Sequence, residues 1–371
     1  MNLKTIIATA ILSMRNSNEY LKYFLFRPKS SSSMDDIIEL NHNFTLSGDI
    51  NGPLLAAVIS VEMIGGLIAN SFVLILTICH IKTWKQPSTI FLTNMLISNL
   101  LIVLFVMPFP ITTCSNGKWM LGETEAEQVK YCYFAGYLYW YSVLLITQSL
   151  VILSFDRFFY IVKSFMYERY MTGKRSLSIV AFSWLIASIL NITPFIGLGS
   201  FGFINSYGSC GPLWEEEMGH VIYTFIIFIF YIGSIVTTTL WTYCYTRRFL
   251  QSERLRTEFI SRIPQQCSVY ISKEKRLIGL FGMMMVVYLT CYAPGLVAIV
   301  AVIFTPLPQP VYASVYVLFL LITVLSPLVQ IIFRRDMREA VSKIIKCQRK
   351  EGASKCERQN SRSFMLTHLH T

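Results

Sequence analysis

Ionisable side chains are rare within the long apolar stretches of this sequence, so those that occur there are the first candidates for chemistry. Glu62 lies inside one such stretch, and the pair Asp156-Arg157 lies near the end of another. A charge among apolar residues is costly unless it is paired, and in a membrane it commonly marks a functional site. These residues are therefore candidates for a ligand contact or a charge switch.

The histidines form no catalytic or metal-binding pattern. They lie in the tails, at loop edges or at the ends of apolar stretches, and none has the spacing of metal ligands. The sequence thus predicts no enzyme, no metal site and no cofactor. The five positions are His42, His80, His220, His368 and His370.

The composition argues against an ordinary soluble protein. Of the 371 residues, 54% are hydrophobic and 14% are charged, and the mean hydropathy is +0.51, which favours lipid as the main solvent. The net charge of +11 raises the alternative of nucleic acid binding. However, the basic residues lie in short segments between apolar stretches, and this spacing favours a membrane protein with no nucleic acid partner.

Seven apolar stretches are long enough to cross a bilayer. About 20 helical residues span roughly 30 Å of hydrocarbon, and a helix pairs its backbone polar groups internally. We therefore predict an all-α membrane protein, a bundle of seven transmembrane helices. The predicted spans are Pro53–Cys79, Ser88–Thr112, Tyr131–Val162, Ser176–Gly197, Gly219–Thr246, Glu274–Phe304 and Gln309–Phe333.

The basic residues predict the orientation of the bundle, because cytoplasmic loops retain Lys and Arg. With the N-terminus outside, 25 of the 32 basic residues fall in the cytoplasmic segments. The extracellular loops then carry acidic residues, among them Glu123, Glu125 and Glu127. The sequence thus predicts a multi-pass plasma membrane protein with an extracellular N-terminus.

Residues 1–52 are polar and mixed, which predicts a disordered extracellular tail ahead of the membrane domain at residues 53–333. Residues 5–13 form only a weak apolar stretch without a convincing cleavage site, so a plain tail is expected, with a signal peptide as the alternative. Asn43-Phe44-Thr45 is a glycosylation acceptor pattern in this tail.

Residues 334–371 form the predicted cytoplasmic tail, which begins with a short amphipathic helix. Met337, Val341, Ile344 and Ile345 share one helical face with basic residues opposite, a pattern typical of a helix that lies on the inner leaflet. Cys347 at its end is either palmitoylated or an unmodified thiol.

Several short motifs occur at fixed places on the predicted spans. Arg157 of Asp156-Arg157-Phe158 lies 25 residues after Cys132, about 37 Å along a helix, so the two lie at opposite faces of the membrane. The other motifs are Asn70 with Val73, Trp119-Met120-Leu121-Gly122, Trp184 with Pro194, Cys210, Cys291-Tyr292-Ala293-Pro294 and Ser326-Pro327-Leu328-Val329-Gln330.

In this order and spacing the motifs resemble those of the rhodopsin-like (class A) G-protein-coupled receptors, from Gly66 to Cys347. Met171-Thr172 before the fourth span and residues 194–200 after it are most similar to the opsin and melatonin-receptor branches. The resemblance implies a receptor that activates a heterotrimeric G protein, with receptor kinases and arrestin as further partners.

The resemblance also assigns roles to single residues. It implies a disulfide between Cys132 and Cys210, which the oxidising extracellular side permits. It implies that Arg157 pairs with Asp156 and with Glu274 at rest, and that activation breaks the second pair as the sixth helix swings outward. The alternative for Arg157 is a purely structural charge at a helix end.

The sixth and seventh spans carry the remaining switch residues that the resemblance implies. Pro294 kinks the sixth span and gives it a pivot. Tyr292 stands where most relatives carry a tryptophan that senses ligand, although packing alone would also explain it. Ser326-Pro327 occupies the place of the family's Asn-Pro.

This sequence departs from the family at its polar core. Asn99 stands where relatives carry the carboxylate of a sodium site, and Ile146 and Ser326 replace two other residues of that site. A neutral amide does not balance a buried cation, so we predict no sodium regulation. Gln330 replaces the tyrosine that stabilises the active state in the family, which puts efficient G-protein activation in doubt.

The ligand is predicted from what the upper spans offer. No lysine occurs in the seventh span and Leu320 stands at the place of the retinal lysine, which excludes a covalent retinal pigment. Tyr139 stands where amine receptors carry a carboxylate. The remaining side chains suit a neutral, flat or lipophilic molecule, unless they serve only packing or the interfacial belt. The predicted pocket comprises Tyr139, Trp140, Val143, Tyr292, Leu296, Ile299, Tyr316 and Leu320.

Three functional hypotheses follow. The first is a plasma membrane receptor for such a small molecule. The second is a weakly signalling or non-signalling relative, a heteromer partner or scavenger, motivated by Asn99, Ser326 and Gln330. The third, a transporter, has little support because the sequence lacks an inverted repeat or paired broken spans around a charged site.

Overall fold

A computed structural model describes the protein at residues 44–79, 86–196, 200–213, 240–249, 251–252, 266–302, 305, 307–334 and 337–343. The chain divides into two units, Met1–Asn43 and Phe44–Thr371, and everything below concerns the second. The predicted glycosylation site Asn43, the predicted palmitoylation site Cys347 and most of the fifth span lie outside the described residues.

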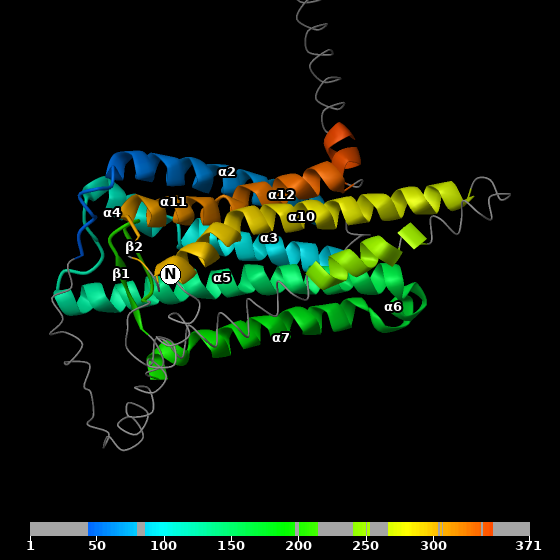
Figure 1. The fold of residues 1–371 in the computed structure, drawn as a ribbon, viewed down its shortest axis with the longest axis horizontal. Coiled ribbons are helices and arrows are strands. Elements are labelled where there is room, and N and C mark those ends of the chain that lie inside the picture. The colour runs from blue at the N-terminus through cyan, green and yellow to red at the C-terminus, as the bar shows by residue number, and fades with distance from the viewer. Residues whose placement is uncertain are drawn as a thin grey trace, which may run out of the picture. The chain divides into compact units, whose positions relative to one another are not determined.

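Long helices run side by side through the second unit (Figure 1). Within the described ranges, five stretches are long and apolar enough to cross a membrane, and each contains one of the predicted spans or most of it. The helices of these stretches are α2 (Gly52–Cys79), α3 (Pro87–Phe105) with α4 (Pro108–Asn116), α5 (Glu125–Val162), α7 (Gly173–Asn191), and α11 (Gln309–Leu320) with α12 (Ile322–Phe333).

Helix α10 (Gln266–Val302) corresponds to the predicted sixth span and begins eight residues before Glu274. Residues 240–249 are helical and belong to the C-terminal end of the predicted fifth span. Residues 337–343 form a short helix in which Met337 and Ala340 pack against Val73 and Leu76 of α2. The predicted amphipathic helix is therefore present over this part of its length.

Two of the spans that were predicted as continuous are each divided into two helices. The second breaks at Val106 and Met107, just before Pro108 starts α4, because proline lacks the backbone N–H and clashes with the preceding turn. The seventh breaks at Leu321, and Pro327 lies within α12. Pro294 lies within α10 without ending it.

Two helix ends differ from the predicted bounds for local reasons. Helix α5 begins at Glu125, six residues earlier than predicted, because Thr124 and Glu127 form a capping box that satisfies the first backbone N–H groups. Helix α7 ends at Asn191, before Pro194, and a short 3-10 turn η2 (Thr193–Ile196) follows. Asn191 is buried and its amide donates to the Tyr137 carbonyl.

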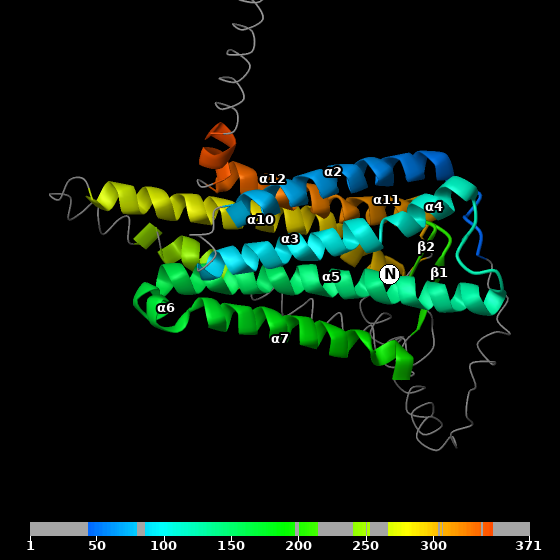
Figure 2. The ribbon, with the colours of Figure 1, turned by 180° about the vertical axis from the view of Figure 1, so that it is seen from behind.

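Helix α5 lies at the centre of the bundle. It packs against α3, α7, α10 and the short helix α6 (Ser164–Tyr170), and the view from behind shows α3 on one side of it and α7 on the other (Figure 2). Its residues from Ser142 to Leu150 are all buried. The helix that carries Asp156 and Arg157 is thus the one with most neighbours to position them.

An antiparallel hairpin lies at the end of the bundle opposite α6 (Figure 1). Strand β1 (Phe201–Ile204) pairs with β2 (Ser209–Pro212) in the register Phe203 to Cys210. These two strands were not predicted from the sequence. The turn between them places Tyr207 and Gly208 inward, and Gly208 has a φ of 64°, a conformation that favours glycine.

Candidate functional site

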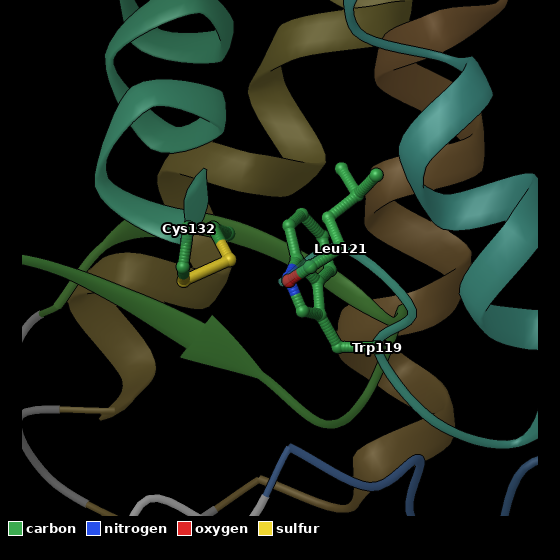
Figure 3. Close-up of a disulfide and its surroundings, with 4 residues drawn as sticks. Trp119, Leu121 and Cys132 are labelled. Atoms are coloured by element: carbon green, nitrogen blue, oxygen red, sulfur yellow. A yellow bond between two sulfur atoms is a disulfide. The ribbon is translucent and has the colours of Figure 1, made fainter. Parts of the chain in front are cut away.

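A disulfide joins the hairpin to the central helix. Cys132 of α5 is bonded to Cys210 of β2, with a Cα–Cα distance of 5.4 Å, which confirms the predicted pair. Figure 3 shows this bridge beside Trp119, whose indole N–H donates to the Leu121 carbonyl at 2.9 Å. Gly136 lets the strand approach, because a Cβ there would lie 2.9 Å from Cβ of Phe201.

The first described residues cover the same end of the bundle. Thr45 forms a β-bridge with Lys118. The backbone N–H of Trp119 donates to the Phe44 carbonyl, and the backbone N–H of Ser47 donates to the Asn205 carbonyl. Phe44 and Trp119 are buried in one cluster with the disulfide. Three segments distant in sequence therefore close over the helices here.

Beneath this cover, six aromatic rings form a continuous series, which we call the aromatic column. Tyr207 of the hairpin turn stacks on Tyr316 of α11, with ring centroids 4.1 Å apart and an interplanar angle of 4°. Successive contacts at 5.6, 5.6, 5.1 and 4.0 Å continue the series into α10. The column comprises Tyr207, Tyr316, Tyr139, Phe319, Tyr292 and Tyr288.

The structure brings together most of the predicted pocket residues. Tyr139, Tyr292 and Tyr316 belong to the column. Trp140, Val143 and Leu320 are buried in the same hydrophobic core. The side chains of Leu296 and Ile299 lie outside the described side chains, so their place in a pocket stays a prediction.

Three residues of the column, Tyr207, Phe319 and Tyr288, were not among the predicted pocket residues. One feature of the sequence could have indicated the position of Tyr207. This residue lies three residues before Cys210, and the bridge to Cys132 holds this part of the loop over the helices. Phe319 is adjacent to Leu320, and Tyr288 is one turn before Tyr292, but neither neighbour indicates that the rings touch.

At the other end of the bundle, Asp156 is the centre of a buried charge cluster. Its carboxylate pairs with Nη2 of Arg157 at 2.9 Å. It also accepts hydrogen bonds from the Tyr167 hydroxyl at 2.7 Å and from Oγ of Ser88 at 2.9 Å. Charge-assisted bonds of this kind are the strong ones in proteins, so α5, α6 and α3 are joined here.

The Arg157–Asp156 pair is as the sequence predicted, whereas the partner role of Tyr167 was missed. Burial, and next to it the negative charge of Asp156, raises the pKa of the Tyr167 hydroxyl above its usual value, so this group stays a neutral donor at physiological pH. The Glu274 side chain lies outside the described side chains. Its pairing with Arg157 therefore stays a prediction.

A polar network lies midway between the two ends. Nδ2 of Asn99 in α3 donates to Oδ1 of Asn70 at 3.0 Å and to Oγ of Ser326 at 2.6 Å. Nδ2 of Asn70 donates in turn to the Thr323 carbonyl at 2.7 Å. These buried groups join α2, α3 and α12 by neutral hydrogen bonds, and Pro327 lies buried beside Ser326.

Several buried polar side chains have an atom without a hydrogen-bond partner among the described residues, and Gln330 and Glu62 are two of them. Both amide atoms of Gln330 in α12 are in this state, and so is Oε2 of Glu62 in α2. Such groups are uncommon in native proteins because desolvation without compensation is costly. Each therefore requires an explanation.

The profile of the 7 transmembrane receptor (rhodopsin family) matches residues 69–331 of this chain. The match covers more than half of the sequence, including the disulfide, the charge cluster and the polar network. The chain belongs to this family. The class A assignment that the motifs suggested is thereby confirmed, and the family is one of receptors rather than enzymes.

Known relatives resemble the receptor over its membrane region. The 5-hydroxytryptamine receptor 7 of Xenopus laevis is 22% identical over 264 residues, 68% of this chain and 59% of its own length. The short-wave-sensitive opsin 1 of Homo sapiens is 29% identical over 246 residues, 65% of this chain and 66% of its own length. The receptor thus matches less than two thirds of the length of these relatives.

The crystal structure of squid rhodopsin has the same fold, with a TM-score of 0.71 at 17% sequence identity, over 82% of this chain and 87% of that chain. The expected likeness to opsins is confirmed by the human opsin described above. Similarity to an amine receptor was not suggested by the motifs. The likeness to melatonin receptors stays a prediction.

Proposed function

We propose that this receptor binds a small, flat, lipophilic molecule in the outer half of the bundle and activates a heterotrimeric G protein. Activation would open the cytoplasmic ends of α5 and α10. We place the receptor in the plasma membrane with its N-terminus outside. Receptor kinases and arrestin are proposed as further partners on the family resemblance alone.

The observation that carries this proposal is the aromatic column. It leads from Tyr207 in the extracellular hairpin to Tyr288 and Tyr292 of α10, close to Pro294. The parallel stacking of Tyr207 on Tyr316 indicates that this position accepts a flat apolar ring. A ligand ring there would shift the column and favour a bent conformation of α10 at Pro294, where bending needs little energy.

The ligands that the relatives' names suggest do not transfer directly. A 5-hydroxytryptamine receptor and an opsin are both similar to this chain. However, Leu320 has no amine for retinal, and Tyr139 has no carboxylate for an ammonium group. The proposal therefore rests on the shape and chemistry of the column.

A ligand panel tests the proposal. Lipids and indoles are applied to cells that express the receptor, and G-protein dissociation is measured directly. We expect at least one compound to raise dissociation, and Tyr316→Leu to reduce its potency about tenfold, because ring stacking contributes about 0.5–1.5 kcal/mol. Tyr141→Leu, an aromatic residue of α5 outside the column, serves as the control. Equal potency in both variants would contradict the proposal.

The buried Gln330 favours a second candidate, a receptor relative that signals weakly and acts as a heteromer partner or scavenger. By the family resemblance, a tyrosine at this place stabilises the active state, and Gln330 has no described partner that replaces its contacts.

We expect Gln330→Tyr to raise G-protein dissociation severalfold at equal surface expression if the second candidate is right. Gln330→Leu, which is apolar and close in size, controls for the loss of the amide. A wild-type receptor that already reaches the level of Gln330→Tyr would exclude the second candidate.

A further inference from the structure

Glu62 is the feature that the proposed function leaves unexplained. Its side chain lies in α2, ten residues after Gly52, which places it about 15 Å into the helix. The residue is only 8% exposed, and Oε2 has no hydrogen-bond partner among the described residues. A carboxyl group in this state is stable only when a proton or a cation neutralises it.

The receptor itself offers no positive charge at this depth. In the printed sequence, residues 53–79, 88–112, 131–155, 176–197, 219–246, 277–304 and 309–333 contain no Lys or Arg, and Glu62 is the only acid among them. His220 is the one histidine in these ranges, and it lies next to the predicted start of its span. Either a proton or a cationic ligand must therefore neutralise Glu62.

Glu62 lies on the face of α2 that packs toward the seventh span. Residues four apart share a helical face, and Glu62, Gly66 and Asn70 form such a row. A Cβ on Gly66 would lie 2.9 Å from Oγ1 of Thr323, and Asn70 donates to the Thr323 carbonyl. Helix α11 also contacts α2, so the carboxyl group points into the bundle.

A helix that contacts α2 also carries a member of the aromatic column. Tyr316 belongs to α11, and α11 contacts α2. The Tyr316 hydroxyl is buried and has no hydrogen-bond partner in the described part of the chain. A buried acid and a buried tyrosine hydroxyl, each with an unpartnered oxygen, therefore lie on two helices that contact each other.

We propose that Glu62 is the anionic anchor of the ligand site, and that the ligand is an organic cation, a basic nitrogen attached to a flat apolar group. The ammonium group pairs with Glu62, and the tyrosine faces add cation–π attraction. The inference rests on the proposed function, since it uses the same site. A neutral ligand was expected because Tyr139 of α5 stands where amine receptors carry a carboxylate. The inference replaces that expectation, because Glu62 of α2 supplies the acid instead.

The test uses the purified full-length receptor in lipid nanodiscs and two probes of equal shape. Benzyltrimethylammonium carries the charge, and neopentylbenzene is its uncharged isostere. Dissociation constants are measured by saturation-transfer NMR titration. We expect wild type to bind the cation at least tenfold more tightly than Glu62→Gln does, and both to bind the uncharged probe equally.

Two further variants separate an anchor from a structural role. Tyr316→Phe keeps the ring and should bind the cation within about threefold of wild type, whereas Tyr316→Leu should lose about tenfold. Glu125→Gln removes an exposed acid of α5 and should change nothing. Equal cation binding by wild type and Glu62→Gln, or no cation binding by wild type, would overturn the inference.

This outcome is distinguishable from failure of the proposed function. The binding measurement needs no G protein, so it reports on Glu62 even if signalling is absent. Conversely, a receptor that signals in response to an uncharged ligand, and whose response is unchanged in Glu62→Gln, would keep the proposed function and lose the anchor.

Discussion

Replacing Cys132 and Cys210 together by serine is expected to lower the free energy of unfolding by about 4.5 kcal/mol in the chain-entropy treatment of cross-links. The bridge joins residues 78 apart in the sequence. Without the bridge the unfolded chain has a higher conformational entropy, whereas the folded state gains no comparable stabilisation. The melting temperature of the purified receptor and its expression at the cell surface measure the effect.

The same variant should also lose ligand affinity, because the hairpin places Tyr207 on Tyr316. With the bridge absent, noncovalent contacts alone hold the hairpin, among them those of Phe201 and of the segment at residues 44–47. The control is Cys79→Ser, which removes an exposed free thiol and should leave both quantities unchanged. A double variant that melts at the wild-type temperature would contradict this prediction.

Asp156→Ala is expected to be the most damaging single substitution in the buried charge cluster. It removes the partner of Arg157, Tyr167 and Ser88 at once and leaves a buried guanidinium group unpaired. Breaking a buried ion pair from one side costs about 3–5 kcal/mol. Thermal unfolding of the purified receptor should show this loss, whereas Glu125→Ala, an exposed acid on the same helix, should stay near wild type.

Basal signalling provides the second measurement at this site. Freed from Asp156, Arg157 no longer holds the resting arrangement, so we expect basal G-protein dissociation to rise severalfold at matched surface expression. Glu274→Gln should raise it as well if Glu274 is the partner on α10, as the family resemblance implies. Basal dissociation that is unchanged in both variants would exclude a resting charge clamp around Arg157.

Secondary structure was predictable where it depends on local chemistry. For the spans that the structure describes, the apolar length predicted helices whose ends differ by at most eight residues from those observed, because a backbone in lipid must pair with itself. Pro108 explains the break within the second predicted span, and Pro194 explains why α7 ends earlier than predicted. These prolines were visible in the sequence, but a proline does not always end a helix, since Pro294 lies within α10 without ending it.

The sequence by itself predicted the seven spans from their apolar length, and motif spacing along a rigid helix placed Cys132 and Arg157 at opposite faces of the membrane. The family, the Cys132–Cys210 pair and the Asp156–Arg157 pair followed from the resemblance of the motifs. Only the tertiary structure decided which side chains meet. Tyr207 reaches Tyr316, Tyr167 reaches Asp156, and Gly66 and Asn70, in the helical row of Glu62, meet Thr323. Each of these depends on how a loop folds back or how a helix is rotated, and contacts between residues distant in sequence leave no periodic signal in the chain.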